Sequence, residues 1–299
     1  MSDSMTKPEK TNRRGGSRVA SGLSRKGNLP YFLFLCLWAA LTIAIFLWLV
    51  SNSLKSNQEI FGNSWGLPLD PVANGVTNYV KAWTISNMGG YFLNSVGVTA
   101  GAVIFTVGFS APAAYALSRI PFLGSRPVFY YFIAGMGLPF QLILVPLYAL
   151  FVNLGLINTQ IGLVVAFTAV SIPFTILLLT GFFRSLPIEL EEAAAVDGAS
   201  EFGIFWKIMM PVATPGLFTA AIFNFVVIWQ EYLLTALLIT SDDRRTLPVG
   251  LMSMRQSLQY SSDWASMFAG IVVVVVPSFI IFVALSNRIM AGLTMGSGK

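Results

Sequence analysis

Long apolar stretches, separated by shorter polar connections, dominate the sequence from residue 30 onward. The first stretch, Pro30–Val50, is 21 residues long, enough for an α-helix to cross about 30 Å of hydrocarbon. Backbone N–H and C=O groups cannot stay unpaired in lipid, so uncharged runs of this length are expected to be helices and not open strands. The pattern predicts six spanning helices, near residues 30–50, 92–118, 127–151, 161–183, 214–240 and 264–288.

The third and fourth helices share one uncharged region, which runs from Pro127 to Phe183 over 57 positions. That length is too great for one span of about 20 residues. A polar break at 153–160, which contains Gly155, divides it into two. Prolines inside the expected spans predict kinks, which are common in membrane helices and structural when taken singly. As a set they suggest a hinge or a cavity wall: Pro112, Pro139, Pro146, Pro173 and Pro277.

The two ends of the chain differ from the apolar middle. Residues 1–28 are polar and basic, which favours a disordered tail. A cleaved signal peptide is less favoured, because the following apolar run exceeds the usual length of about 7–15 residues and shows no small-residue cleavage site. Residues 291–299 are small and glycine-rich, so we expect a flexible cytoplasmic tail. The membrane domain is therefore expected to cover residues 29–290.

The distribution of Lys and Arg predicts the orientation of the helices. With both termini in the cytoplasm, the inner segments hold thirteen of the eighteen basic residues and the outer segments hold five. This excess agrees with the tendency of cytoplasmic segments to carry Lys and Arg. The connection 184–211 then lies in the cytoplasm.

Composition narrows the function classes. Of 299 residues, 55% are hydrophobic and 10% are charged, against about 25% charged in ordinary soluble domains. The chain has no histidine and a single cysteine, Cys36, which excludes His-based catalytic triads and the usual zinc sites. It also lacks a GxxxxGK[ST] phosphate loop. We therefore expect no catalytic residues, no metal and no enzyme activity. The net charge of +5 comes largely from the N-terminal tail and does not indicate nucleic-acid binding.

The expected cytoplasmic connection has the marks of two short helices. Pro187 suits a first helical position, and Glu189, Glu191 and Glu192 lie near the positive end of the helix dipole. Gly198 suits a helix stop in the left-handed conformation. The second helix would place one apolar face at i, i+3, i+4 and i+7. That face is formed by Phe202, Phe205, Trp206 and Met209.

Two short helices joined at a glycine predict a compact knob, and Ala193, Ala194 and Ala195 would let a partner's surface approach closely. An amphipathic connector lying on the membrane is the alternative. Anionic lipid would repel the acidic first helix, which favours docking to a protein.

This connection resembles the coupling motif of bacterial ABC importer permeases, written E-A-A, three residues, G, nine residues, I-x-L-P. The sequence carries Glu192-Ala193-Ala194, Gly198, Ile208 and Pro211 at that spacing, with Met210 in place of the leucine. Met for Leu is a mild change, because the two side chains have similar volumes. Further similarity to the sugar permeases lies in Phe92–Ser95, Ala114–Arg119, Leu156–Thr159 and Trp229–Leu233. Six expected helices without a large inserted loop resemble the smaller membrane subunit of maltose-type importers.

The resemblance implies an all-α integral membrane protein with the type I ABC importer permease fold, in a bacterial or archaeal cell membrane. It implies four kinds of partner: a second, different permease, a cytoplasmic ABC ATPase dimer, an extracytoplasmic solute-binding protein and membrane lipid. ATP and Mg²⁺ would be bound by the ATPase and no cofactor by this chain. The resemblance assigns coupling to the ATPase to Glu192, Ala193, Ala194, Asp197, Gly198, Ile208 and Pro211.

Polar residues in or near the spans are candidates for the solute path, because sugars need hydrogen-bonding groups and aromatic faces. Glu231 is the only acidic residue within an expected span, where a charge is costly and functional by default. Alternatively, it reaches water or pairs with Arg244 or Arg245. The other candidates are Asn224, Gln230 and Tyr232, and, more weakly, Asn94, Gln141 and Asn153, because polar side chains also join helices.

The sequence-based hypothesis is import of a di- or oligosaccharide by alternating access, driven by ATP. One alternative is an ABC permease for another polar solute, such as glycerol phosphate. A different class, the ion-coupled secondary transporter, would predict inverted repeats and intramembrane carboxylates. We find no convincing repeat, and such carboxylates are nearly absent.

Overall fold

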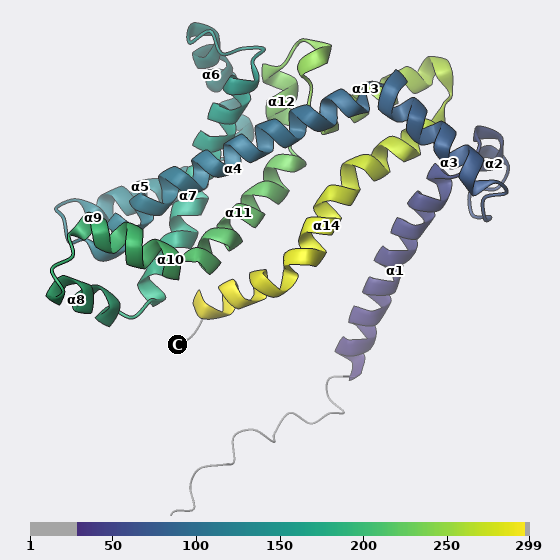
Figure 1. Ribbon diagram of the computed structural model, residues 1–299. Helices are drawn as coiled ribbons and strands as arrows, with labels where there is room; N and C mark the ends of the chain where they lie inside the picture. Colours follow the sequence, from purple (N-terminus) through teal and green to yellow (C-terminus); the bar gives the residue numbers. More distant parts are fainter. Residues whose placement is uncertain (1–28, 297–299) are drawn as a thin grey trace, which may run out of the picture. The chain divides into compact units, whose positions relative to one another are not determined.

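The computed structural model describes residues 29–296, and every regular element in that range is a helix (Figure 1). The tail expected over residues 1–28 and the last three residues of the tail expected over 291–299 lie outside the described residues. The chain divides into two compact units, residues 1–49 and 50–299. The described part of the first unit is helix α1, Leu29–Ser53, whose last turn belongs to the second unit. Residues 30–53 are apolar enough and long enough to span a membrane.

Helices α4, Met88–Arg119, and α7, Gln160–Ser185, form the centre of the second unit. They run parallel, because contacts join both their starts and their ends. At the starts, Gln160 Nε2 donates to Asn94 Oδ1 at 2.6 Å. At the ends, Arg119 Nε donates to the carbonyl of Phe183 at 3.1 Å. The connections that follow α4 and α7 therefore share one end of this unit.

The region predicted as one helix at 127–151 is instead two helices, α5, Ser125–Met136, and α6, Phe140–Asn153. Their axes meet at 101°. Pro139 lies at the break; it lacks a backbone N–H and disfavours helical geometry at the residue before it. The proline marks a sharp turn here, and not only the kink that we expected.

The fifth predicted helix, 214–240, also ends early: α11 covers Thr214–Trp229. It is followed by α12, Leu233–Leu238, the single-turn helix η3, Asp242–Arg244, and α13, Leu247–Ser261. The last helix, α14, extends over Trp264–Gly296, beyond its predicted end near 288. In the described part of the chain, four helices can span a membrane singly, and six spans result if each of two bent pairs counts as one.

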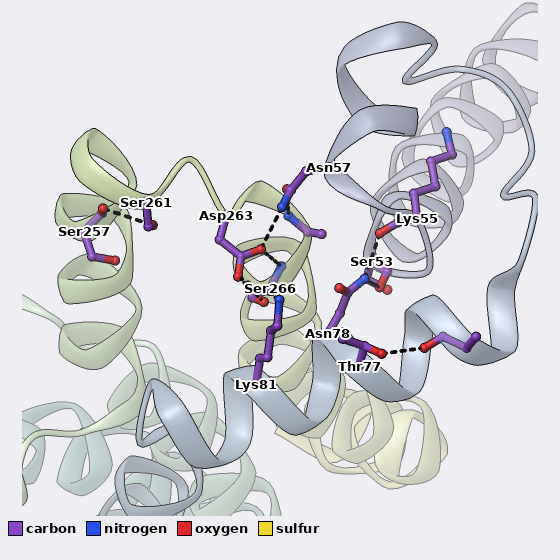
Figure 2. A network of polar contacts seen from close by, with 12 residues as sticks. Ser53, Lys55, Asn57, Thr77, Asn78, Lys81, Ser257, Ser261, Asp263 and Ser266 are labelled. Atoms are coloured by element: carbon purple, nitrogen blue, oxygen red, sulfur yellow. Dashed lines mark hydrogen bonds and ion pairs between the residues drawn. The ribbon is translucent and has the colours of Figure 1, made fainter.

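Between α1 and α4 lie α2, Asn57–Gly62, α3, Pro71–Val80, and the π-helical segment η1, Lys81–Ile85. A network of polar contacts ties this region to the start of α14 (Figure 2). We call it the polar clamp, and it consists of Asn57, Lys81, Asp263, Ala265 and Ser266. Its central residue is Asp263, which accepts from Asn57 Nδ2 at 3.1 Å and pairs with Lys81 Nζ at 3.8 Å. Burial raises the pKa of the Asp263 carboxyl, but hydrogen bonds from Asn57 and Ser266 and the Lys81 charge outweigh it, so the pKa is lowered.

Candidate functional site

The connection between α7 and α11 forms a helical knob, defined here as residues 186–211, at the end of the second unit where α4 finishes (Figure 1). Helix α8 covers Glu189–Val196 and stops at Gly198, whose φ of +79° is left-handed, as predicted. The chain then enters α9, Glu201–Ile204, where the Ser200 side chain accepts from the Gly203 N–H. The π-helical segment η2, Phe205–Met209, and α10, Met210–Val212, complete the connection.

A buried ion pair fixes the knob to the ends of α4 and α7. Arg119 Nε lies 3.2 Å from Glu191 Oε1, and the two side chains are only 9% and 17% exposed. Tyr115 donates its hydroxyl to Glu191 Oε2 at 3.3 Å. The Arg119 guanidinium also donates to the carbonyls of Phe183 and Leu186, which lie at the end of α7. Arg119 thus adds a second donor to the Phe183 carbonyl, which also accepts from the Leu186 N–H, and holds α8 against two spanning helices.

The residues around this ion pair also make apolar contacts. The Tyr115 ring packs against Phe183, with centroids 5.6 Å apart, and against Phe205 at 5.0 Å. Ala194 and Met209 from the knob are buried in the same core. The apolar face expected on the second helix is therefore divided: Phe205 and Met209 pack inward, whereas Phe202 and Trp206 stay exposed. The segment Phe205–Met209 is π-helical and therefore does not have the residue spacing of an α-helix. Residues at i, i+3, i+4 and i+7 then do not all lie on one face.

The exposed surface of the knob carries most of the residues that the motif assigns to coupling. Glu192, Ala193, Asp197 and Gly198 are exposed, as is Pro211, and Ile208 is half-buried. Ala194 departs from the expectation that three successive alanines face a partner, because its methyl group is buried against the bundle. Exposed apolar side chains adjoin these residues: Val196 is 88% exposed and Phe202 74%. The surface is suited to docking by a protein with a matching apolar cleft.

The candidate path residues do not converge on one site. Asn224 is buried and its amide donates to Thr175 Oγ1 at 2.9 Å, so it joins α11 to α7. Asn94 donates to the carbonyls of Asp243 and Arg245 at the opposite end of the unit from the knob. Two candidates do lie together: Gln230 and Tyr232 line a cavity of about 540 Å³ between the end of α11, α13 and α14. Gln141 and Asn153 are exposed on α6.

Glu231 has a local structural role that the sequence-based alternatives did not include. Its two carboxylate oxygens accept from the backbone N–H groups of Leu234 at 2.8 Å and Thr235 at 3.2 Å. These groups are in the first turn of α12, where N–H groups lack helical partners. The proposed pairing with Arg244 or Arg245 does not occur, because these side chains pair with Asp243 and Asp242.

Replacing Glu231 with Ala is expected to destabilise the protein by about 0.5–2 kcal/mol, because two N–H groups of α12 lose their acceptor. Glu231→Gln should cost less, since its amide oxygen can still accept. Thermal unfolding in detergent measures the effect. The neighbouring Gln230→Ala, which changes an exposed side chain, serves as the matched control. Equal melting temperatures for Glu231→Ala and the control would contradict the capping role.

Sequence reasoning did not identify Tyr115, Arg119 and Glu191 as one cluster. The available signal was the acidic residue next to Glu192 together with a lone Arg at the end of a span. Spacing cannot pair residues 72 positions apart, so only the side-by-side ends of α4 and α7 reveal the contact.

Comparisons with known proteins show the family of this chain. The profile of the family described as "Binding-protein-dependent transport system inner membrane component" matches residues 106–291. The chain is 38% identical over 281 residues to the diacetylchitobiose uptake system permease protein NgcG of Streptomyces coelicolor, covering 94% of this chain and 92% of the relative. It is 31% identical to the arabinooligosaccharides transport system permease protein AraQ of Halalkalibacterium halodurans, covering 86% and 92%.

A solved structure has a similar fold. It is a crystal structure of a bacterial ABC transporter involved in the import of the acidic polysaccharide alginate. The match has a TM-score of 0.72 and covers 89% of this chain and 96% of the other chain. At 22% identity, the match supports the fold alone. Together with the helical spans, it establishes the all-α permease fold predicted from the sequence.

Proposed function

The chain belongs to the family of binding-protein-dependent transport system inner membrane components, and we propose that it is the permease subunit that carries an oligosaccharide across the membrane. The family places the chain among the non-catalytic, multi-pass membrane subunits of ABC importers. The sugar is supported by the relatives, since NgcG and AraQ are named for diacetylchitobiose and arabinooligosaccharides.

The observation that carries the proposed mechanism is the knob, exposed on one side and fixed to spanning helices on the other. We propose that the ATPase dimer grips the exposed side through Glu192, Ala193, Asp197 and Gly198. Ile208 and Pro211 would shape its edge, and Ala194 would support the knob from beneath. Because Glu191 and Arg119 join α8 to α4, movement of the knob is passed to the bundle. ATP can shift the inward–outward equilibrium only if the ATPase binds the two states differently.

The proposed assembly adds a second, different permease and an external solute-binding protein, with ATP and Mg²⁺ held by the ATPase subunits. The excess of basic residues supports a cytoplasmic location for both termini and for the knob. The solute would pass between the two permeases. On this chain Gln230 and Tyr232 are the strongest candidates to face it, because both line one cavity. Glu231, Asn94 and Asn224 would shape the path indirectly, because their side chains hold neighbouring segments in place. Gln141 is exposed on α6 and would contribute from that surface.

The test is uptake in reconstituted vesicles. The chain, purified with the subunits that copurify with it, should import a radiolabelled oligosaccharide only when ATP is supplied on the knob side and the binding protein on the other. An ion gradient without ATP should give no uptake. Uptake driven by the gradient alone would contradict the ABC mechanism. ATP-driven uptake of glycerol phosphate in place of any sugar would contradict only the substrate class.

A further inference from the structure

Helix α3 carries an apolar stripe that the transport mechanism does not use. Val72, Val76 and Val80 follow one another at i, i+4 and i+8, so they lie on one face of the helix. Their side chains are 75%, 62% and 54% exposed. Asn78 lies on the opposite side of the helix and Gly75 lies beside it, and both are buried. The helix is therefore amphipathic in an unusual sense, with its polar side packed against the chain and its apolar side outward.

Contacts on the polar side fix α3 to the last turn of α1. The Asn78 amide donates to the carbonyls of Ser53 at 2.9 Å and Lys55 at 2.8 Å (Figure 2). The Tyr79 hydroxyl lies 3.0 Å from Ser53 Oγ. A Cβ on Gly75 would meet a methyl carbon of Leu54 at 2.8 Å, so the glycine allows this close approach. Asn78 thereby satisfies a carbonyl at the end of a spanning helix.

The other end of the segment is held at the start of α14. Lys81, directly after α3, pairs with Asp263, which precedes the first residue of α14. The same carboxylate accepts from Ser266 Oγ at 2.8 Å, and Asn57 Oδ1 accepts from the Ala265 N–H at 2.9 Å. The Asn78 contacts and the polar clamp together join α3 to the ends of two helices, α1 and α14, that are each long and apolar enough to span the membrane. The ends of spanning helices are expected at the boundary between hydrocarbon and water.

We infer that α3 is an interfacial helix that inserts its Val72–Val76–Val80 stripe into the outer boundary of the lipid bilayer. A helix tied to the ends of two spanning helices lies at headgroup level, where its exposed apolar face is within reach of lipid. Interfacial helices bury such a face about 5–10 Å into the headgroup and acyl boundary. The stripe contains no charged residue, and the helix is flanked by Asp70 and Lys81, which can remain in water.

The position of a reporter relative to lipid and water tests this inference. In a Cys36→Ser background, which removes the only cysteine, single cysteines replace Val76 or Thr77 and carry a bimane label. Thr77 is exposed and adjacent, but it is turned by about 100° around the helix axis, which makes it a matched control. The full chain, with the subunits that copurify with it, is placed in phosphatidylethanolamine–phosphatidylglycerol vesicles. Quenching is measured with aqueous iodide and with a lipid that carries a nitroxide near its headgroup.

The nitroxide lipid should quench the label at Val76 about threefold more than at Thr77, and iodide should show the reverse order. A label at Val72 should behave like the one at Val76, which guards against a local defect in one variant. Equal access of iodide to positions 76 and 77 would overturn the inference, because the stripe would face water. Protection of position 76 from both quenchers would also overturn it, because a protein surface would then cover the stripe. None of these readouts depends on transport, so failure of the proposed function would not imitate them.

Discussion

Arg119→Ala is expected to lower ATP-driven uptake by about tenfold or more and to destabilise the protein by about 3 kcal/mol. The substitution leaves the Glu191 carboxylate buried without its cation, and breaking one side of a buried pair typically costs about 3–5 kcal/mol. The slight exposure of both side chains places the expected value at the lower end of that range. The carbonyls of Phe183 and Leu186 lose their hydrogen bonds from the guanidinium as well, although Phe183 keeps the Leu186 N–H. Melting temperature and vesicle uptake measure the two effects.

A matched control and a second substitution separate the ion pair from a general charge effect. Arg126→Ala removes an exposed cation at the same end of the unit and should leave both readouts nearly unchanged. Arg119→Ala combined with Glu191→Ala should be less damaging than the two single effects added together, because no buried charge is left alone. Strict additivity, or an Arg119→Ala protein that melts and transports like the parent, would contradict the role assigned to this pair.

The general architecture follows from sequence because lipid imposes simple rules. Uncharged runs of about 20 residues must be helices, so the spans around α1, α4, α7 and α14 can be recognised without a structure. The end of the helix at Gly198 could also be predicted from the sequence, since only glycine adopts the left-handed conformation without a steric cost. The function class was predicted from the coupling motif, because its residues recur at a fixed spacing in ABC importer permeases, and the family match agrees with that prediction.

Breaks inside apolar runs could not be predicted from the sequence in the same way. The sequence around Pro139 is as apolar as its surroundings, and a proline in a membrane helix can leave a mild kink or mark a turn of 101°. Glu231 illustrates a related problem. A carboxylate in an apolar region indicated a solute or charge partner, yet it caps a helix that begins where the predicted span should have continued. Its role follows from the unpaired backbone N–H groups at the start of α12. These groups can be identified only when the ends of the helices are known.

The residues that face the solute were the hardest to predict, because their arrangement depends on packing between helices. Asn224 has a side chain suited to a sugar contact, but its amide donates to the Thr175 hydroxyl and to the carbonyl of Ala220. Gln230 and Tyr232 share a cavity only because α11 ends near α13 and α14. In the same way, one predicted apolar face divides into the buried Phe205 and the exposed Phe202. Polarity alone does not separate a helix joint from a binding contact.

Gly198→Val is expected to uncouple ATP hydrolysis from uptake while leaving the chain in the membrane. The residue has a φ of +79°, a conformation that costs a β-branched side chain about 1–3 kcal/mol. A Cβ at this position would meet no atom within 4 Å, so the penalty comes from the backbone and not from a clash. The turn between α8 and α9 would therefore relax and move the exposed residues that we propose the ATPase grips. Vesicle assays should show retained ATP hydrolysis and uptake lowered by about tenfold.

Two further variants make the interpretation specific. Gly198→Asn should retain most of the uptake, because asparagine tolerates the left-handed conformation better than other residues with a side chain. Glu192→Lys reverses an exposed charge without changing the backbone, so it should uncouple transport with little change in melting temperature. Normal uptake by both Gly198→Val and Glu192→Lys would remove the coupling role from the knob. Equal loss in Gly198→Asn and Gly198→Val would show that the open space beside Gly198, and not its backbone conformation, is what the partner requires.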